Sequence, residues 1–261
     1  MTPTEQILGI KFFKDDVGRA VALMSERGGF LVAPSGPCFA RLRRDDAYRE
    51  AMVNADMAIP DSGAMVLLWR LFGGRKLTRI SGWKYLHGLS DRFFAEKQGD
   101  VFWIVPNERA RETTGRWLEQ NNFQFSSDDF YAAPIYGAVV EDRYLVDQIH
   151  NRKPRHLVVG IGSGPQEKLG YYLREHLNYR PAIHCVGAAL GFLTGEQVKI
   201  PAWADRFYLG WLFRLITNPV RFLPRLWRAT ELPWLIFRYR EKLPPLRSRQ
   251  RRTEDRGQYA N

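Results

Sequence analysis

The sequence predicts an α/β protein built on an open, doubly wound sheet of mostly parallel strands, with helices on both faces. Short apolar runs alternate with longer amphipathic runs along most of the chain. Some runs, such as HLVVGIG from His156, are apolar on both faces, as strands between two helix layers are. Hydrophobic residues make up 45% of the 261, enough for a substantial core. Ligands of such sheets bind beyond the carboxyl ends of the strands, so the residues after each strand are candidates for a site.

The expected elements follow from these runs. Strands are expected at Ile7 to Phe13, Phe30 to Ala33, Met57 to Pro60, Val101 to Val105, His156 to Ile161 and Ala182 to Val186. Helices are expected at Asp16 to Glu26, Asp45 to Asn54, Gly63 to Phe72, Trp83 to Glu96, Glu108 to Asn121, Glu141 to Asn151 and Pro165 to Leu177. The sequence has no run of about 18 apolar residues, and MTPTEQILGIKFF lacks the pattern of a secretory signal. We therefore expect neither a spanning helix nor a signal peptide.

Positive charge is concentrated near the C-terminus. The formal net charge is +11, and residues 205–252 hold twelve Lys/Arg against three Asp/Glu. An anionic partner is expected: a nucleic acid, a phospholipid surface or a phosphorylated small molecule. We predict three parts, namely an α/β body over 1–202, a basic aromatic helical appendage over 203–243 and a disordered basic tail over 244–261. The two cysteines, Cys38 and Cys185, lie in apolar segments and are interpreted as buried free thiols of a reducing compartment.

The appendage admits three interpretations. It interleaves Arg with Trp, Phe and Leu, which is typical of a basic amphipathic surface lying on an anionic bilayer. It is also compatible with a helical hairpin packed on the body, or with single-stranded nucleic acid binding. Because the aromatic residues cluster with Leu and Ile, we favour the membrane surface and expect no nucleic acid partner. The predicted location is the cytoplasm, peripheral on the inner face of the cell membrane.

Three strand-end or nearby loops carry polar candidates. In Ile59-Pro60-Asp61-Ser62-Gly63 an acid follows an apolar strand, and a carboxylate there can take a proton from an attacking hydroxyl. The competing interpretation is helix capping by Asp61 or Ser62. Ser35 lies in the first strand-end loop, and Arg79 follows an exposed basic stretch where it can bind phosphate.

A fourth loop is rich in glycine. Gly160-Ile161-Gly162-Ser163-Gly164-Pro165-Gln166-Glu167 leads from a strand into a helix, whose N-terminus favours negative charge. It matches neither the GxGxxG fingerprint nor the Walker A loop. The competing interpretation is a capping box made by Ser163 and Gln166.

Taken together and in order, these segments resemble the WecG/TagA/CpsF family of bacterial glycosyltransferases. The matching stretches are NADMAIPDSGAMVLLWRLFGG, RISG, LVVGIGSGPQE, CVGAALGFLTGEQVKIPAWA and GWLFRLITNPVRFLPRL, and the resemblance covers about residues 5–230. It implies a Rossmann-like body with a membrane-docking appendage. It also implies a UDP-sugar donor of the N-acetylhexosamine or uronic acid type and a polyprenyl-diphosphate-linked sugar acceptor, in polysaccharide or exopolysaccharide biosynthesis.

The resemblance also implies roles for residues. Asp61 matches the family's proposed catalytic base, in a reaction without a DxD-type metal site. We expect neither a metal nor a cofactor, and the sequence contains no DxD. The expected substrate-binding residues are Ser35, Arg79, Gly162, Gln166, Arg214, Arg221 and Arg225.

The chain departs from the family pattern at several positions. Ala33 and Ser35 stand where Thr and Asn are usual, and Ser62 replaces a Gly. The turn reads Gly164-Pro165 before Gln166, and Lys84 stands where an acid is usual. These departures indicate a different sugar or a divergent branch.

We therefore predict an inverting, metal-independent hexosyltransferase. A non-catalytic nucleotide-sugar or polyprenyl-phosphate binding module of a polysaccharide assembly is the alternative, and a homo-oligomer is left open.

Overall fold

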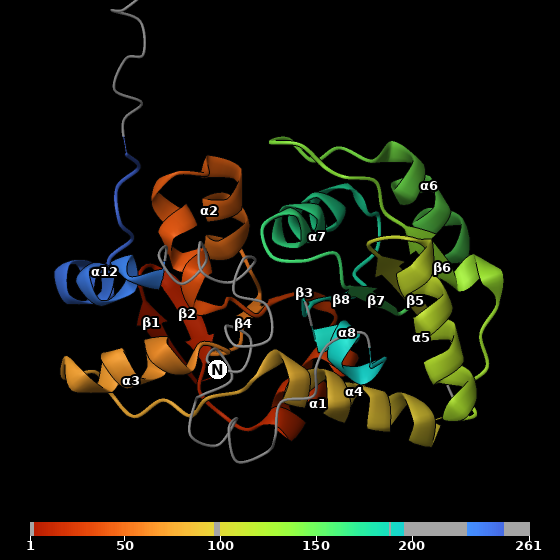
Figure 1. Ribbon diagram of the computed structural model, residues 1–261, viewed down its shortest axis with the longest axis horizontal. Helices are drawn as coiled ribbons and strands as arrows, with labels where there is room; N and C mark the ends of the chain where they lie inside the picture. Colours follow the sequence, from red (N-terminus) through yellow and green to blue (C-terminus); the bar gives the residue numbers. More distant parts are fainter. Residues whose placement is uncertain (1–2, 97–99, 188, 196–228, 248–261) are drawn as a thin grey trace, which may run out of the picture.

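The structure is a computed structural model that describes residues 3–96, 100–187, 189–195 and 229–247 (Figure 1). Within these residues, eight strands form one sheet in the order β1-β2-β4-β3-β8-β7-β5-β6. Every pairing is parallel except the antiparallel pair of β1 and β2. The strands are β1 Thr4–Ile7, β2 Ile10–Phe13, β3 Gly29–Val32, β4 Met57–Ala58, β5 Val101–Val105, β6 Phe130–Ala132, β7 His156–Val159 and β8 Ala182–Cys185. The α/β fold class with a mostly parallel sheet is confirmed.

One expected strand is wrong. Ile7 to Phe13 is not a single strand but a hairpin, in which Leu8 and Gly9 link β1 to β2. Both linking residues have positive φ, 52° and 81°, as the two-residue turns of tight hairpins require. The turn is hidden in the sequence because Leu8 continues the apolar run and is fully buried. The short strand β6 was not predicted either.

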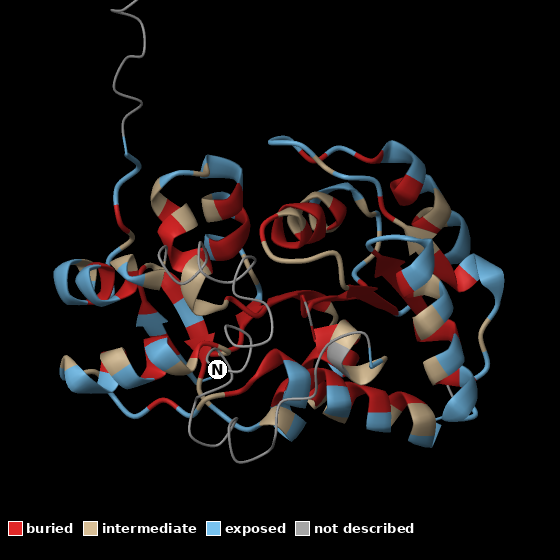
Figure 2. Ribbon diagram, in the orientation of Figure 1, coloured by how far each residue is buried: buried red, intermediate tan, exposed pale blue. Residues whose placement is uncertain are grey.

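Helices cover both faces of the sheet (Figures 1 and 2). One hydrophobic cluster joins the sheet to α2, α3, α6, α7 and α12, and the other joins it to α1, α4, α5 and α8. Residues of β3 alternate between the clusters, with Phe30 and Val32 on one side and Leu31 on the other. The helices are α1 Val17–Arg27, α2 Asp46–Val53, α3 Gly63–Leu71, α4 Gly82–Glu96, α5 Glu108–Gln120, α6 Arg143–Arg152, α7 Pro165–His176, α8 Ala189–Leu193 and α12 Glu231–Tyr239, with 3₁₀ helices η1 Gly36–Arg43 and η2 Ser127–Asp129.

The C-terminal segment 229–247 packs on the body. α12 contacts α3 and η1, and its Leu232, Leu235 and Ile236 are buried. The chain beyond it bonds to the β1–β2 turn, where the Leu8 amide donates to the Arg240 carbonyl at 2.7 Å. Of the predicted appendage, residues 203–228 lie outside the described residues. No described helix is long and apolar enough to cross a membrane.

The sheet order determines where a site can form. β4, β3, β8 and β7 are consecutive and parallel, so their carboxyl ends share one edge. The loops after these four strands therefore meet, although they are far apart in the sequence.

Candidate functional site

The carboxylate of Asp61 is not used to cap its own helix. Asp61 follows β4 and is half-buried. The next residue, Ser62, is the N-cap of α3, where its Oγ accepts from the Met65 amide at 3.2 Å. Of the two capping candidates, the structure thus selects Ser62 and leaves the Asp61 side chain for other contacts.

Asp61 contacts the start of a different helix. Its Oδ1 accepts from the Gly82 amide, the first residue of α4, at 2.9 Å. The backbone partial charges at a helix N-terminus favour a carboxylate in this place. Arg79 precedes this helix and donates from Nε to the Asp61 carbonyl at 2.8 Å. The Ile80 amide also bonds to the Pro60 carbonyl, so the structure brings Asp61 and Arg79 together.

The loop after β3 borders the same place. A side chain at Gly36 would meet Ser62 Oγ at 3.3 Å, so this loop lies against the turn that holds Asp61. The predicted residue Ser35 is half-buried, and its Oγ shares a hydrogen bond with Cys38 Sγ at 3.1 Å. Ala33, at the position where the resemblance led us to expect Thr, lies close to Gly82. A Cβ placed on Gly82 would be 3.7 Å from the Ala33 Cβ.

The glycine-rich turn after β7 is open at Gly162. A Cβ at Gly162 would meet no atom of the described residues within 4 Å, and its φ of 96° favours glycine. The competing interpretation, a capping box of Ser163 and Gln166, is wrong by one residue. The N-cap is Gly164, whose amide donates to Glu167 Oε2 at 2.5 Å. Gly164 has a φ of 103°, which favours glycine. The N-cap of α7 is therefore this glycine and not Ser163.

Gln166 lies beneath the turn and not in an open space. It is fully buried, with Nε2 donating to Glu167 Oε1 at 3.1 Å and to the Cys185 carbonyl at 3.5 Å. Its Oε1 has no hydrogen-bond partner among the described residues. A direct contact with substrate at this acceptor requires the turn to move.

Sequence reasoning missed a buried polar cluster between η1 and α7. Burial raises the pKa of the Glu167 carboxyl, which is fully enclosed, and the Arg41 guanidinium partly opposes that rise. Burial, followed by the charge of Glu167, also raises the pKa of the Cys38 thiol. Glu167 was missed although it is adjacent in sequence to the predicted Gln166. Arg41 was missed because no strand or helix pattern covers its segment.

The three appendage arginines Arg214, Arg221 and Arg225 lie outside the described residues. Within the described part of the chain, no three His, Cys, Asp or Glu side chains are grouped as metal ligands would be. The structure thus brings together Asp61, Arg79, Ser35 and the Gly162 turn around the centre of the sheet edge.

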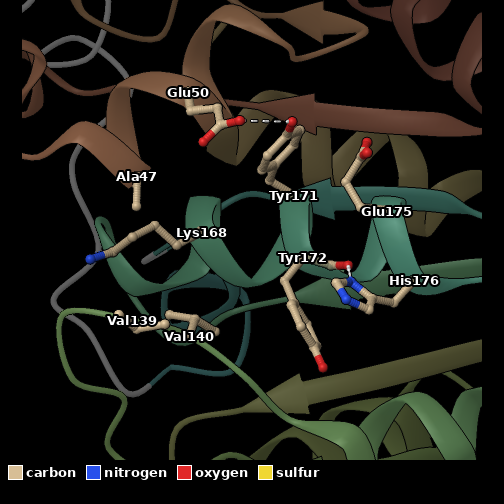
Figure 3. A pocket seen from close by; sticks show the side chains of 9 residues that line it. All are labelled: Ala47, Glu50, Val139, Val140, Lys168, Tyr171, Tyr172, Glu175 and His176. Carbon is tan, nitrogen blue, oxygen red and sulfur yellow. Dashed lines mark hydrogen bonds between the residues drawn. The ribbon is translucent and has the colours of Figure 1, made fainter.

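A separate cleft of about 190 Å³ opens between α2 and α7 (Figure 3). Its walls include Val139, Val140 and Tyr172, and Glu50 accepts a hydrogen bond from Tyr171 Oη at 3.3 Å. None of the predicted site residues lines it. The cleft is therefore distinct from the edge that carries Asp61.

Comparison with known proteins points to one family. Residues 5–247 match the model of the glycosyl transferase WecG/TagA/CpsF family. A relative in Bacillus spizizenii, an N-acetylglucosaminyldiphosphoundecaprenol N-acetyl-beta-D-mannosaminyltransferase, is 25% identical over 201 residues, which are 76% of this chain and 75% of the relative. A protein of the same name in Bacillus subtilis is 25% identical over 209 residues, again 76% and 75% of the two chains. Since the family model covers nearly the whole chain and the α/β fold agrees with it, this protein belongs to the WecG/TagA/CpsF family and is a glycosyltransferase.

Proposed function

We propose that this enzyme transfers a sugar from a UDP-sugar to a polyprenyl-diphosphate-linked acceptor in polysaccharide biosynthesis, with inversion at the anomeric carbon. The names of the relatives support the acceptor class, since both act on an N-acetylglucosaminyl diphosphoundecaprenol. By the same names, an N-acetylhexosamine is the donor sugar to test first, ahead of a uronic acid.

The half-buried Asp61 carboxylate carries the proposal. It accepts the proton of the acceptor hydroxyl as that oxygen attacks the anomeric carbon of the donor. The bond from the anomeric carbon to the diphosphate oxygen breaks, and its electron pair leaves with UDP. A single displacement inverts the anomeric centre, and Asp61 returns the proton to solvent. The Gly82 amide holds Oδ1 in place, which fixes the direction of the base.

Fixed cations balance the charge of the departing UDP in this proposal. Arg79 is held beside Asp61 by its Nε bond to the Asp61 carbonyl. Arg214, Arg221 and Arg225 add further positive charge from the appendage. Transfer without a metal is proposed because these arginines supply the charge and the sequence has no DxD pair.

A membrane surface is the proposed place of action. The packed pair α3 and α12 exposes four large apolar side chains, Leu67, Leu71, Trp234 and Phe237. The same helices and the residues that follow them also carry exposed cations, namely Arg70, Arg75, Lys76, Arg238 and Arg240. Exposed apolar side chains and cations on one pair of helices suit an anionic lipid surface. This supports peripheral association with the inner face of the cell membrane, where the lipid-linked acceptor is present.

The membrane proposal has a direct test. The paired substitutions Leu71→Glu and Phe237→Glu are expected to reduce co-sedimentation with anionic vesicles, because they place charge where apolar contact is needed. Ile135→Glu, at a fully exposed residue of another segment, serves as the control. Equal co-sedimentation of all variants contradicts the proposal.

The proposed reaction is tested by a screen of UDP-sugars against a short-chain lipid-diphosphate sugar, scored by UDP release. We expect one UDP-sugar to be consumed with wild-type protein and not with Asp61→Asn. Failure of every donor with folded wild-type protein would refute the proposed reaction. The appendage is better probed by Arg221→Gln and Arg225→Gln than by truncation near residue 204, since truncation also removes the buried residues of α12.

A further inference from the structure

Arg41 reaches from one strand-end segment across to another. It lies on η1, which follows β3, and is half-buried. A side chain at Gly164 would collide with Arg41 Nη1 and lie 2.8 Å from Cζ. The guanidinium therefore lies directly against the glycine-rich turn that precedes α7, and the absence of a side chain at Gly164 makes room for it.

The guanidinium of Arg41 is not paired with any group in the described part of the chain. Among the described residues it makes no hydrogen bond or ion pair, and its one ring contact is with Tyr48, 6.0 Å from Cζ to the ring centre. Its neighbours differ, since Arg44 pairs with Glu231 and Arg49 donates to the Leu42 carbonyl. A guanidinium has five N–H donors in a planar fork, so Arg41 offers most of its donors to a ligand.

The surroundings of Arg41 favour an anion. Gly162 leaves open space on the same turn, and α7 is a 12-residue helix whose N-terminus carries partial positive charge. The fully buried Gln166 Oε1, although unpaired among the described residues, is an acceptor and therefore adds nothing to the binding of an anion. The Arg41 guanidinium, Gly162 and the first amides of α7 therefore border the same turn.

We propose that Arg41 binds a substrate diphosphate at the β7–α7 turn. This inference rests on the proposed transfer, in which donor and acceptor both carry a diphosphate. Position favours the donor, since the turn and the helix N-terminus are the elements that hold nucleotide phosphates in sheets of this kind. Arg41 is then a diphosphate-binding cation in addition to Arg79.

A structural role is the competing explanation. The charge of Arg41 lowers the pKa of the buried Glu167 carboxyl. In this explanation, Arg41 serves only to balance the negative charge of Glu167. The two roles differ in what they change: charge balance affects the melting temperature, whereas diphosphate binding affects affinity.

The test is calorimetric binding of UDP and of inorganic diphosphate to wild-type protein, Arg41→Gln, Arg41→Lys and the exposed control Arg116→Gln. We expect Arg41→Gln to weaken diphosphate binding about 10- to 100-fold, the loss typical for hydrogen bonds to charged groups. The diphosphate affinity of Arg41→Lys should lie between those of wild type and Arg41→Gln, because lysine keeps the charge and loses the planar fork of donors. Arg116→Gln should bind as wild type.

Steady-state kinetics then separate the two diphosphates. A rise in KM for the UDP-sugar alone assigns Arg41 to the donor, and a rise for the lipid acceptor alone assigns it to the acceptor. Unchanged affinities and KM values in Arg41→Gln, or a wild-type protein that binds neither UDP, inorganic diphosphate nor the lipid acceptor, overturn the inference. Weakened binding in Arg41→Gln with no turnover by wild-type protein would instead refute the proposed reaction and leave the diphosphate site standing.

Discussion

Two carboxylates at the same edge of the sheet have opposite environments. Asp61 and Glu167 each follow a buried strand and stand at the start of a helix. Asp61 is half-buried and bonds to the first amide of a different helix. Glu167 is fully buried and bonds to the Gly164 amide at the start of its own helix.

The difference depends on which neighbour caps the helix. Ser62 caps α3, so the Asp61 carboxylate is not needed as the cap of that helix. At α7 the cap position is a glycine without a side chain, so Glu167 supplies the acceptor. An acid at the start of a helix is therefore available for chemistry when another residue satisfies the free backbone amides.

Asp61→Asn is expected to have the largest effect. The amide cannot accept the hydroxyl proton, so kcat should fall by about 10²- to 10⁴-fold. Because Asn still accepts from the Gly82 amide, the melting temperature should stay near that of wild type. Asp147→Asn, at an exposed residue of α6, is the control for both assays. A variant with substantial residual kcat would remove Asp61 from the role of base.

Lowering the pH tests the same effect at other groups, because burial should disfavour the charged form of any ionisable side chain in this core. His184 bonds to Tyr85 Oη at 2.8 Å and to His156 Nδ1 at 3.1 Å, and both imidazoles are buried. Burial lowers the pKa of His156 to about 4 and that of His184 well below its usual value. The unfolded chain therefore binds more protons than the folded one between about pH 6.5 and 4.

Stability from the histidines is thus present above about pH 6.5 and is lost as the pH falls toward 4. For His156 this loss in the free energy of unfolding is roughly 2–4 kcal/mol. Urea unfolding at several pH values measures it, and His156→Gln should flatten the profile relative to wild type. His176→Gln, at an exposed residue, should keep the wild-type slope, and equal slopes for all three proteins would contradict the assignment.

Glu167→Ala tests the other half of the comparison. It leaves the Gly164 amide without an acceptor and Gln166 Nε2 with only the 3.5 Å bond to the Cys185 carbonyl, and should cost about 1–3 kcal/mol of folding free energy. Glu167→Gln should cost less, because it keeps one oxygen acceptor and because the raised pKa already reflects a site unfavourable to charge. Thermal unfolding beside exposed Glu112→Ala measures both, and a larger loss for Gln than for Ala would oppose this account.

Ser62→Ala has the smallest expected effect. It removes the acceptor of the Met65 amide and should cost about 1 kcal/mol, whereas Ser62→Gly should cost only a few tenths. Chemical denaturation distinguishes the two variants. If Ser62→Ala is as stable as wild type, another residue caps α3, and the separation of roles between Ser62 and Asp61 is lost.

Particular elements show how far sequence patterns reach. Val101–Val105 is a strand as predicted, because five consecutive buried positions need apolar residues on both faces. The hairpin at Leu8 and Gly9 was missed because a buried leucine at positive φ looks like part of a strand. The segment of η1 was missed because it has no helical repeat, and with it the role of Arg41.

The sequence by itself determined the α/β class, the order of most elements and the positions of Asp61, Arg79 and the glycine turn, because periodicity and turn composition are local properties. Only the tertiary structure decided that Ser62 and not Asp61 caps α3, that Glu167 is sealed inside while Asp61 is not, and that Arg41 meets Gly164. These outcomes depend on strand order, which places the ends of β4, β3, β8 and β7 side by side. Arg41 and Gly164 are more than a hundred positions apart, so no local pattern predicts that they meet.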